Sequence, residues 1–175
     1  WQLIHNVGGG SPGVFMIRAT AEVDGETVTF AYNQKKLGKE PDVNFKPKVQ
    51  FESYFPLPKN ARLEENQVEI NNRKMSVVVG DSRESWVYAI QLLIDSYFGL
   101  CGDIEEINFN FNSVRPIGER IKGFGGTASG PEALQGILKD IVEIFEELPG
   151  NRLRSIDCMD IICACARGII AGSSR

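Results

Sequence analysis

Histidine is almost absent from this 175-residue sequence, in which His5 is the only one. One histidine far from Ser129 in the chain cannot complete a Ser-His-Asp triad with it. We therefore expect Ser129 to cap the helix that follows it rather than to act as a nucleophile. The same shortage leaves the four cysteines without a nearby imidazole partner for a zinc site.

Long apolar runs are also missing. No stretch approaches the roughly 18–20 apolar residues that span a bilayer, and the first residues lack the basic region and apolar stretch of a signal peptide. The 19 basic and 23 acidic residues leave a net charge of −4. This balance argues against nonspecific binding to nucleic acid or to anionic membranes. We expect a soluble, cytoplasmic protein with neither nucleic acid nor membrane as a partner.

Cysteine is sparse and clustered near the end of the chain. Cys158, Cys163 and Cys165 fall in a segment that reads as a helix, while Cys101 stands apart. On a helix, Cys158 and Cys165 share one face and Cys163 lies about 140° from Cys158, so three thiolates do not converge on a metal ion. We expect reduced packing thiols, no disulfide and no metal site.

Residues 1–80 read as β-rich. Strand-like runs flank Asp24 and Gly25, a strong hairpin signal, and a second hairpin is expected around Asn71 and Asn72. Residues 33–66 contain four prolines and scattered charges. We expect an irregular connection or an insertion there.

Residues 81–175 change to helical periodicity. A capping box that starts at Asp81 predicts a helix, and alternating apolar residues at 107–111 predict a half-buried strand. An amphipathic helix is expected to begin at Pro131, and a last one to span about 155–170. This order predicts an α/β fold whose sheet other chain segments complete.

A glycine-rich loop, residues 112–130, separates the expected strand from the next helix. Its glycines allow positive φ or a close approach of backbone N–H groups to a ligand, and the helix that follows begins with a partial positive charge suited to phosphate. The charged residues of the loop are Arg115, Glu119, Arg120 and Lys122, a net charge of +2. The loop has neither the Lys-Ser/Thr of a Walker motif nor a clean dinucleotide fingerprint. Composition alone is consistent both with a tight turn and with an anion-binding site.

Three motifs of this chain resemble those of one enzyme family. From Ile121 the chain reads Ile-Lys-Gly-Phe-Gly-Gly-Thr-Ala-Ser-Gly-Pro, which looks like the signature of the adenosylcobalamin-dependent ribonucleotide reductases, and among them of the monomeric ribonucleoside-triphosphate type. From Asp81 it reads Asp-Ser-Arg-Glu-Ser-Trp, which is similar to the family's Asp-x-Arg-Glu-Gly-Trp helix. The stretch from Asp160 to Gly172 resembles the helix that leads into the loop relaying effector identity to the active site.

The resemblance implies a fold and an activity. The fold is a ten-stranded α/β barrel, with residues 81–175 as a barrel portion carrying the effector-specificity region and residues 1–80 as a β-rich segment or insertion. The activity is the conversion of ribonucleoside triphosphates to deoxyribonucleotides by radical chemistry that adenosylcobalamin initiates on a cysteine. The implied partners are a ribonucleotide substrate, a deoxynucleoside triphosphate effector, a thioredoxin-like reductant and the remaining segment of the reductase.

The resemblance also implies site residues. Arg115 and Lys122 match the two basic positions of the loop that contacts the effector phosphates, although Lys122 replaces an Arg or His of the relatives and loses bidentate geometry. The implied positions in the effector or substrate loops are Gly123, Gly125, Gly126, Thr127, Ser129, Gly172, Ser173, Ser174 and Arg175.

The family's radical cysteine is missing from the sequence. No Asn-Pro-Cys-Gly-Glu-type finger loop and no C-terminal cysteine pair occur. We therefore assign no catalytic residue, expect the chain alone to be inactive, and expect adenosylcobalamin to bind mainly to other parts of the enzyme. The sequence stops at Arg175 inside the second specificity loop, so we expect a fragment of a reductase. The alternative is a noncatalytic nucleotide-binding regulatory or split subunit.

Overall fold

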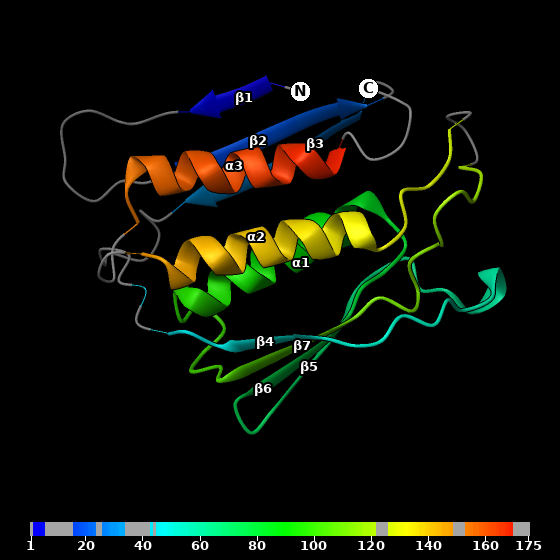
Figure 1. The fold of residues 1–175 in the computed structure, drawn as a ribbon, viewed down its shortest axis with the longest axis horizontal. Coiled ribbons are helices and arrows are strands. Elements are labelled where there is room, and N and C mark those ends of the chain that lie inside the picture. The colour runs from blue at the N-terminus through cyan, green and yellow to red at the C-terminus, as the bar shows by residue number, and fades with distance from the viewer. Residues whose placement is uncertain are drawn as a thin grey trace.

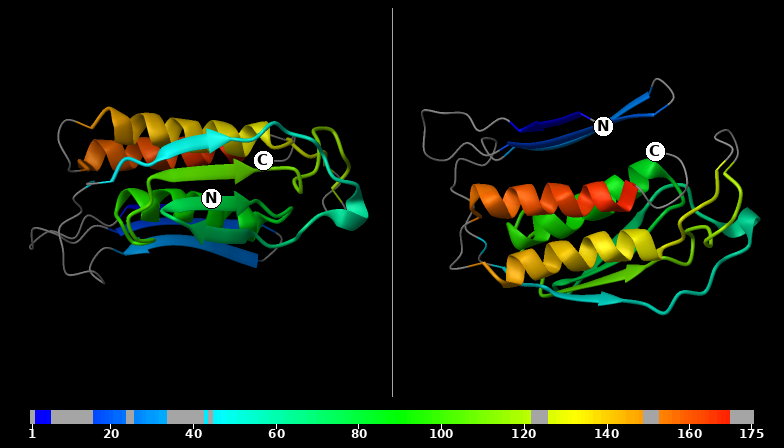
Figure 2. Two further views of the ribbon diagram at one scale, coloured as in Figure 1. Left: turned by 90° about the horizontal axis from the view of Figure 1, so that it is seen from below. Right: turned by 45° about the horizontal axis from the view of Figure 1, so that its top comes forward.

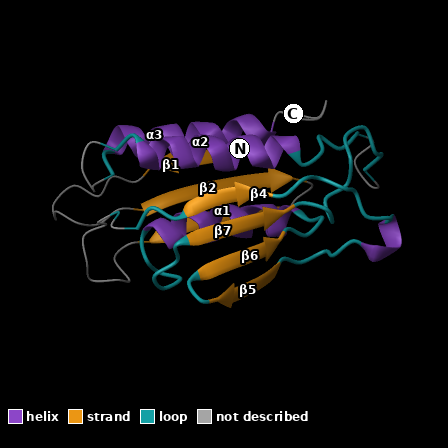
Figure 3. Ribbon diagram, turned by 60° about the horizontal axis from the view of Figure 1, so that its bottom comes forward, coloured by secondary structure: helices purple, strands orange, loops and turns teal. Residues whose placement is uncertain are grey.

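The computed structural model describes residues 2–5, 16–23, 26–33, 43, 45–121, 126–148 and 153–169. Within these ranges a four-stranded mixed sheet is built in the order β4-β7-β6-β5. β4 and β6 run parallel to the central β7, and β5 is antiparallel to β6 (Figure 3). The strands are β4 (Lys48–Phe51), β5 (Gln67–Asn71), β6 (Lys74–Val78) and β7 (Glu106–Asn110).

Three helices lie on one side of this sheet. α1 (Arg83–Tyr97) and α2 (Glu132–Glu146) cover one face, and α3 (Ser155–Ile169) packs against α2 on the side away from the sheet (Figures 1 and 2). The described residues therefore have the α/β architecture that the sequence predicts, with a mixed sheet.

A second, antiparallel sheet lies beyond the helices (Figures 1 and 2). It contains β1 (Gln2–His5), β2 (Met16–Val23) and β3 (Glu26–Asn33). Val23 pairs with Glu26, so only Asp24 and Gly25 connect the two long strands. The strands of the first predicted hairpin are thus confirmed.

The second predicted hairpin is confirmed, and the structure shows its turn type. Asn71 pairs with Lys74, which leaves Asn72 and Arg73 as a two-residue loop. Their φ angles are 48° and 65°. Positive φ at both central residues is the geometry of a type I′ turn, whose twist suits a tight hairpin.

The prediction of an irregular connection over residues 33–66 is wrong at β4. This strand has four residues, too few for a periodic pattern to stand out. Its partner makes it a strand: Lys48 N–H donates to the Glu105 carbonyl at 2.8 Å, and Glu52 N–H donates to the Phe109 carbonyl at 3.0 Å. Only the tertiary pairing with β7 distinguishes β4 from a loop.

α1 begins one residue later than the predicted capping box. The cap is Ser82, whose hydroxyl oxygen accepts from the Ser85 N–H at 3.1 Å. Asp81 is not the cap, because its carboxylate accepts hydrogen bonds from Arg115 instead. The helix runs to Tyr97, and Gly99 follows it with a φ of +67°.

The beginning of α2 overturns another prediction. Its N-cap is Pro131, and no side chain caps it, so Ser129 does not have the expected capping role. The amphipathic pattern of this helix is confirmed. Its buried residues are Leu134, Ile137, Leu138, Ile141 and Phe145.

The main core lies between the four-stranded sheet and the helices. β7 alternates as predicted: Ile107 and Phe109 are fully buried, while Asn108 and Asn110 lie on the opposite face and donate to the Glu52 carboxylate. The apolar face of β7 packs with side chains of the helices and of β6 in one cluster. That cluster includes Met75, Val77, Leu93, Ile94, Tyr97, Leu134, Leu138, Ile141 and Phe145.

Residue 80 separates strands from helices along the sequence but not in space. All the described strands except β7 precede it, and all three α-helices follow it. The four-stranded sheet nevertheless takes β4, β5 and β6 from one side of this position and β7 from the other. None of the helices described has both the length and the apolar character to cross a membrane.

Candidate functional site

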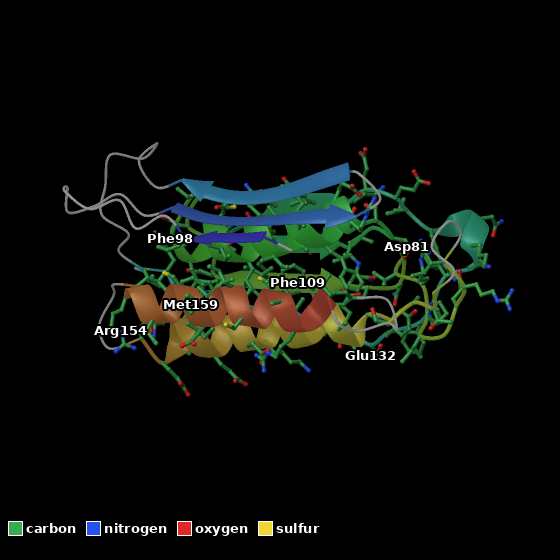
Figure 4. All side chains as sticks on the ribbon, turned by 90° about the horizontal axis from the view of Figure 1, so that it is seen from above. Asp81, Phe98, Phe109, Glu132, Arg154 and Met159 are labelled. Atoms are coloured by element: carbon green, nitrogen blue, oxygen red, sulfur yellow. The ribbon has the colours of Figure 1, made fainter. Side chains whose placement is uncertain are left out.

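The parallel strands end together at one edge of the four-stranded sheet. β4, β6 and β7 all end there, and α1 follows β6 from the same edge. Figure 4 places Asp81, just after β6, at the same end of the molecule as Glu132 at the start of α2, and Arg154 at the opposite end. In open α/β sheets, ligands bind outside the carboxyl ends of the strands. This edge is therefore the candidate site.

Arg115 is held in place at this edge by Asp81. Its Nε donates to both carboxylate oxygens of Asp81 at 2.9 Å, and its backbone N–H donates to Asp81 Oδ1 at 3.1 Å. The side chain of Arg115 is 29% exposed and that of Asp81 is 14% exposed. The guanidinium thus has a fixed orientation and remains partly open to solvent.

A second ion pair lies beside the first. Arg62 donates to both oxygens of Glu119, at 2.8 and 2.9 Å, and its Nε donates to the Leu57 carbonyl at 3.0 Å. The hydrogen bonds from Arg62 lower the pKa of Glu119, so this carboxylate is ionised at neutral pH. Lys59 adds a weaker contact at 3.5 Å.

Two described stretches of the glycine-rich loop, residues 118–121 and 126–128, pair with each other and are here called the glycine hairpin. Ile121 N–H donates to the Gly126 carbonyl, and Ala128 N–H donates to the Glu119 carbonyl. Gly118 N–H closes the base by donating to the Ala128 carbonyl at 2.9 Å. The described parts of the loop are therefore held together by backbone hydrogen bonds as a hairpin.

Gly130 has a φ of +77°, which is one of the two roles that the sequence allows for the glycines of this loop. A Cβ at this position would meet a carboxylate oxygen of Glu132 at 2.4 Å and the backbone nitrogen of Ile117 at 3.1 Å. Gly130 therefore allows the beginning of α2 to lie close to Ile117, the residue before the glycine hairpin.

The structure brings some of the predicted site residues together. Arg115 precedes the glycine hairpin, Gly126 and Thr127 lie on its second strand, and Ser129 follows it. Lys122, Gly123 and Gly125 lie outside the described residues, as do the loop positions Gly172, Ser173, Ser174 and Arg175. α3 ends at Ile169, at the end of the molecule where α2 begins (Figure 1).

Sequence reasoning missed Arg62 and Glu119 as members of this site and assigned Asp81 only to a helix cap. Arg62 lies in an irregular segment and carries no motif, so the sequence offers no signal for its contact 57 residues away. The sequence does contain a signal for Asp81, which is the first residue of one of the three family motifs. The residue was nevertheless interpreted only as a helix cap.

The cysteines of α3 do not form a site with one another. Cys158 is fully buried, and burial raises its pKa to about 12; burial likewise raises the pKa of Cys165 to about 11. The packing prediction is confirmed for Cys158. It is wrong for Cys163, which is exposed. Among the described residues no group of three potential ligands is placed to hold a metal ion.

Thiol alkylation checks this assignment. Because the thiolate is the reactive species, iodoacetamide at pH 8 should label Cys163 well before Cys158 and Cys165. Peptide mass mapping over time measures the order, and labelling of all four cysteines in concentrated guanidinium chloride is the control. Equal rates for Cys158 and Cys163 in the folded chain would contradict the burial described.

Known proteins are similar to this chain in sequence and in fold. A family model described as the insertion domain of B12-dependent ribonucleotide reductase matches residues 53–145, which include the edge residues Arg62, Asp81 and Arg115 and the glycine hairpin. The chain belongs to the B12-dependent ribonucleotide reductase family.

Individual relatives agree with this family. The adenosylcobalamin-dependent ribonucleoside-triphosphate reductase of Lactobacillus delbrueckii subsp. bulgaricus is 33% identical over 159 residues, which cover 86% of this chain and 22% of that protein. The enzyme of the same name from Lactobacillus gasseri is 38% identical over 97 residues, 54% of this chain and 13% of that protein. A crystal structure of a B12-dependent (class II) ribonucleotide reductase matches 79% of this chain and 20% of its own, with a TM-score of 0.63 and 28% identity. The matched part of the chain thus spans between 13% and 22% of the length of these relatives.

Proposed function

We propose that this chain is the effector-binding part of an adenosylcobalamin-dependent reductase that converts ribonucleoside triphosphates to deoxyribonucleotides. One observation carries the proposal: Arg115, the glycine hairpin and the beginning of α2 meet at the carboxyl edge of the parallel strands. The ligand proposed for this edge is a deoxynucleoside triphosphate, bound through its phosphates.

The charges at the edge define how the phosphates bind. Asp81 neutralises Arg115, and Glu119 neutralises Arg62, so the two described pairs leave no net charge. The excess positive charge of the loop therefore comes from Arg120, which is exposed on the glycine hairpin, and from Lys122. In this proposal Arg115 supplies directed donors, Lys122 supplies a point charge, and the N-terminus of α2 adds its partial positive charge.

The rest of the reductase has the remaining roles. We assign none of the described residues to adenosylcobalamin, which in this proposal binds mainly to other segments together with the radical cysteine. The four-stranded sheet becomes part of a ten-stranded barrel that those segments complete. Residues 81–175 contribute the effector-specificity region of that barrel, and residues 1–80 a β-rich segment or insertion. A ribonucleotide substrate and a thioredoxin-like reductant act on the complete enzyme.

Calorimetric titration of this chain with each of the four deoxynucleoside triphosphates tests the proposal. Arg115→Lys keeps a cation beside Asp81 but removes the planar fork, so the affinity should fall about tenfold. The matched control is Arg73→Lys, because Arg73 lies in the β5–β6 turn at the opposite edge and pairs with Glu105 there. Its affinity should stay within about twofold of the wild type. Absence of binding by the wild type, or equal affinity of Arg115→Lys, overturns the proposal.

A further inference from the structure

Arg62 joins three segments at the candidate site. Its own segment follows β4, its two terminal nitrogens bind Glu119 on the glycine hairpin, and Nη1 lies 3.9 Å from Asp81 Oδ2 in the turn between β6 and α1. Arg62 therefore lies between the carboxylate that orients Arg115 and the carboxylate that belongs to the hairpin.

Arg62 acts through these contacts rather than as a ligand-binding residue. Nε, Nη1 and Nη2 all donate to protein oxygens, and the side chain is only 10% exposed. Arg115, at 29% exposure, is much more open. A phosphate approaching the edge meets Arg115 while Arg62 remains occupied.

The contact with Glu119 is the one that locates the glycine hairpin. Glu119 both accepts from Arg62 through its side chain and accepts from the Ala128 N–H through its carbonyl. One residue thus joins the two hairpin strands to each other and to the segment after β4. Bidentate pairing between a guanidinium and a carboxylate fixes direction as well as distance.

We propose that Arg62 is the positioning residue of the effector site, setting the place of the glycine hairpin through Glu119 and supporting Asp81 behind Arg115. The inference rests on the proposed function for the identity of the ligand. Its structural half, the placement of the hairpin, is independent of any ligand.

Two single variants and their combination test the inference in this chain. Arg62→Lys keeps the charge and loses the fork, whereas Glu119→Gln keeps the shape and loses the charge. The matched control is Arg73→Lys with Glu105→Gln, an ion pair of the same residue types at the opposite edge. Amide hydrogen exchange without ligand and calorimetric affinity for inorganic triphosphate are measured well below the melting midpoint of each variant.

The expected exchange result is local. Ile121 and Ala128, whose N–H groups donate within the hairpin, should exchange about tenfold faster in both variants, while the amides of β7 keep their wild-type rates. The control pair should leave the hairpin unchanged. Unchanged exchange at Ile121 and Ala128 in both variants overturns the inference, even for a chain that binds no triphosphate.

The expected binding result separates positioning from simple stabilisation. Each single variant should bind triphosphate about tenfold more weakly than the wild type. The affinity of the double variant should be no lower than that of the single variant that binds more weakly, because both substitutions remove the same contact. Faster exchange with wild-type affinity would make Arg62 a structural residue only and overturn the inference. A wild-type chain that binds no triphosphate contradicts the proposed function instead, and the exchange result still decides the placement of the hairpin.

Discussion

Phe145→Ala should lower the free energy of unfolding by about 4 kcal/mol, since truncating a buried aromatic side chain removes apolar contacts and leaves a cavity. Phe145 is fully buried on α2 and stacks on Tyr97 of α1, with ring centroids 4.3 Å apart and an interplanar angle of 8°. Phe98 contacts the same ring edge-on at 5.9 Å. These three rings join the two helices that cover the sheet, so the loss should affect the whole fold.

Urea unfolding followed by circular dichroism measures this change. Phe55→Ala is the matched control, because it removes the same atoms from a side chain that is 70% exposed. Its free energy of unfolding should change by less than about 0.5 kcal/mol. Similar losses in the two variants would show that Phe145 does not occupy the core described.

Gly80→Ala should lower the free energy of unfolding by about 2–3 kcal/mol through overpacking. A Cβ at Gly80 would lie 2.5 Å from the Glu64 carbonyl oxygen and 2.7 Å from two further backbone atoms of Glu64 and Glu65. Backbone atoms cannot rotate away as a side chain does. The segment that contains Arg62 would have to shift, which strains the hydrogen bonds that the Gly80 N–H donates to Asn66 Oδ1 and that the Asp81 N–H donates to the Leu63 carbonyl.

The same unfolding experiment checks Gly80→Ala, with Gly136→Ala as the matched control. Gly136 lies inside α2, and a Cβ there would meet nothing within 4 Å. Alanine in a helix loses less conformational entropy than glycine, so the control should gain up to about 1 kcal/mol. Gly80→Ala should also weaken triphosphate binding if the segment carries Arg62 with it. A Gly80→Ala variant as stable as the wild type would contradict the close packing of Gly80 on Glu64.

Local patterns were enough to predict much of the secondary structure. The three helices, the alternation of β7 and both hairpins follow from periodicity and from turn residues, whose preferences act over a few neighbouring positions. The glycine loop could be recognised by its composition and by its resemblance to a family signature. Arg115 could be singled out for the same reason.

Contacts between distant segments could not be predicted in this way. β4 is a strand because β7 lies beside it, and Arg62 belongs to the site because Glu119, 57 residues later, folds against it. Asp81 had two possible roles, cap or ion-pair partner, and the approach of Arg115 decided between them.

The sequence by itself determined the three helices, the two hairpins, the strand β7, the composition of the glycine loop and the family, because each depends on residues close together in the chain. The tertiary structure alone decided which charged groups meet at the carboxyl edge. Ion pairs and parallel strand pairing depend on distances in space, and no local preference of Arg62, Glu119 or β4 specifies them.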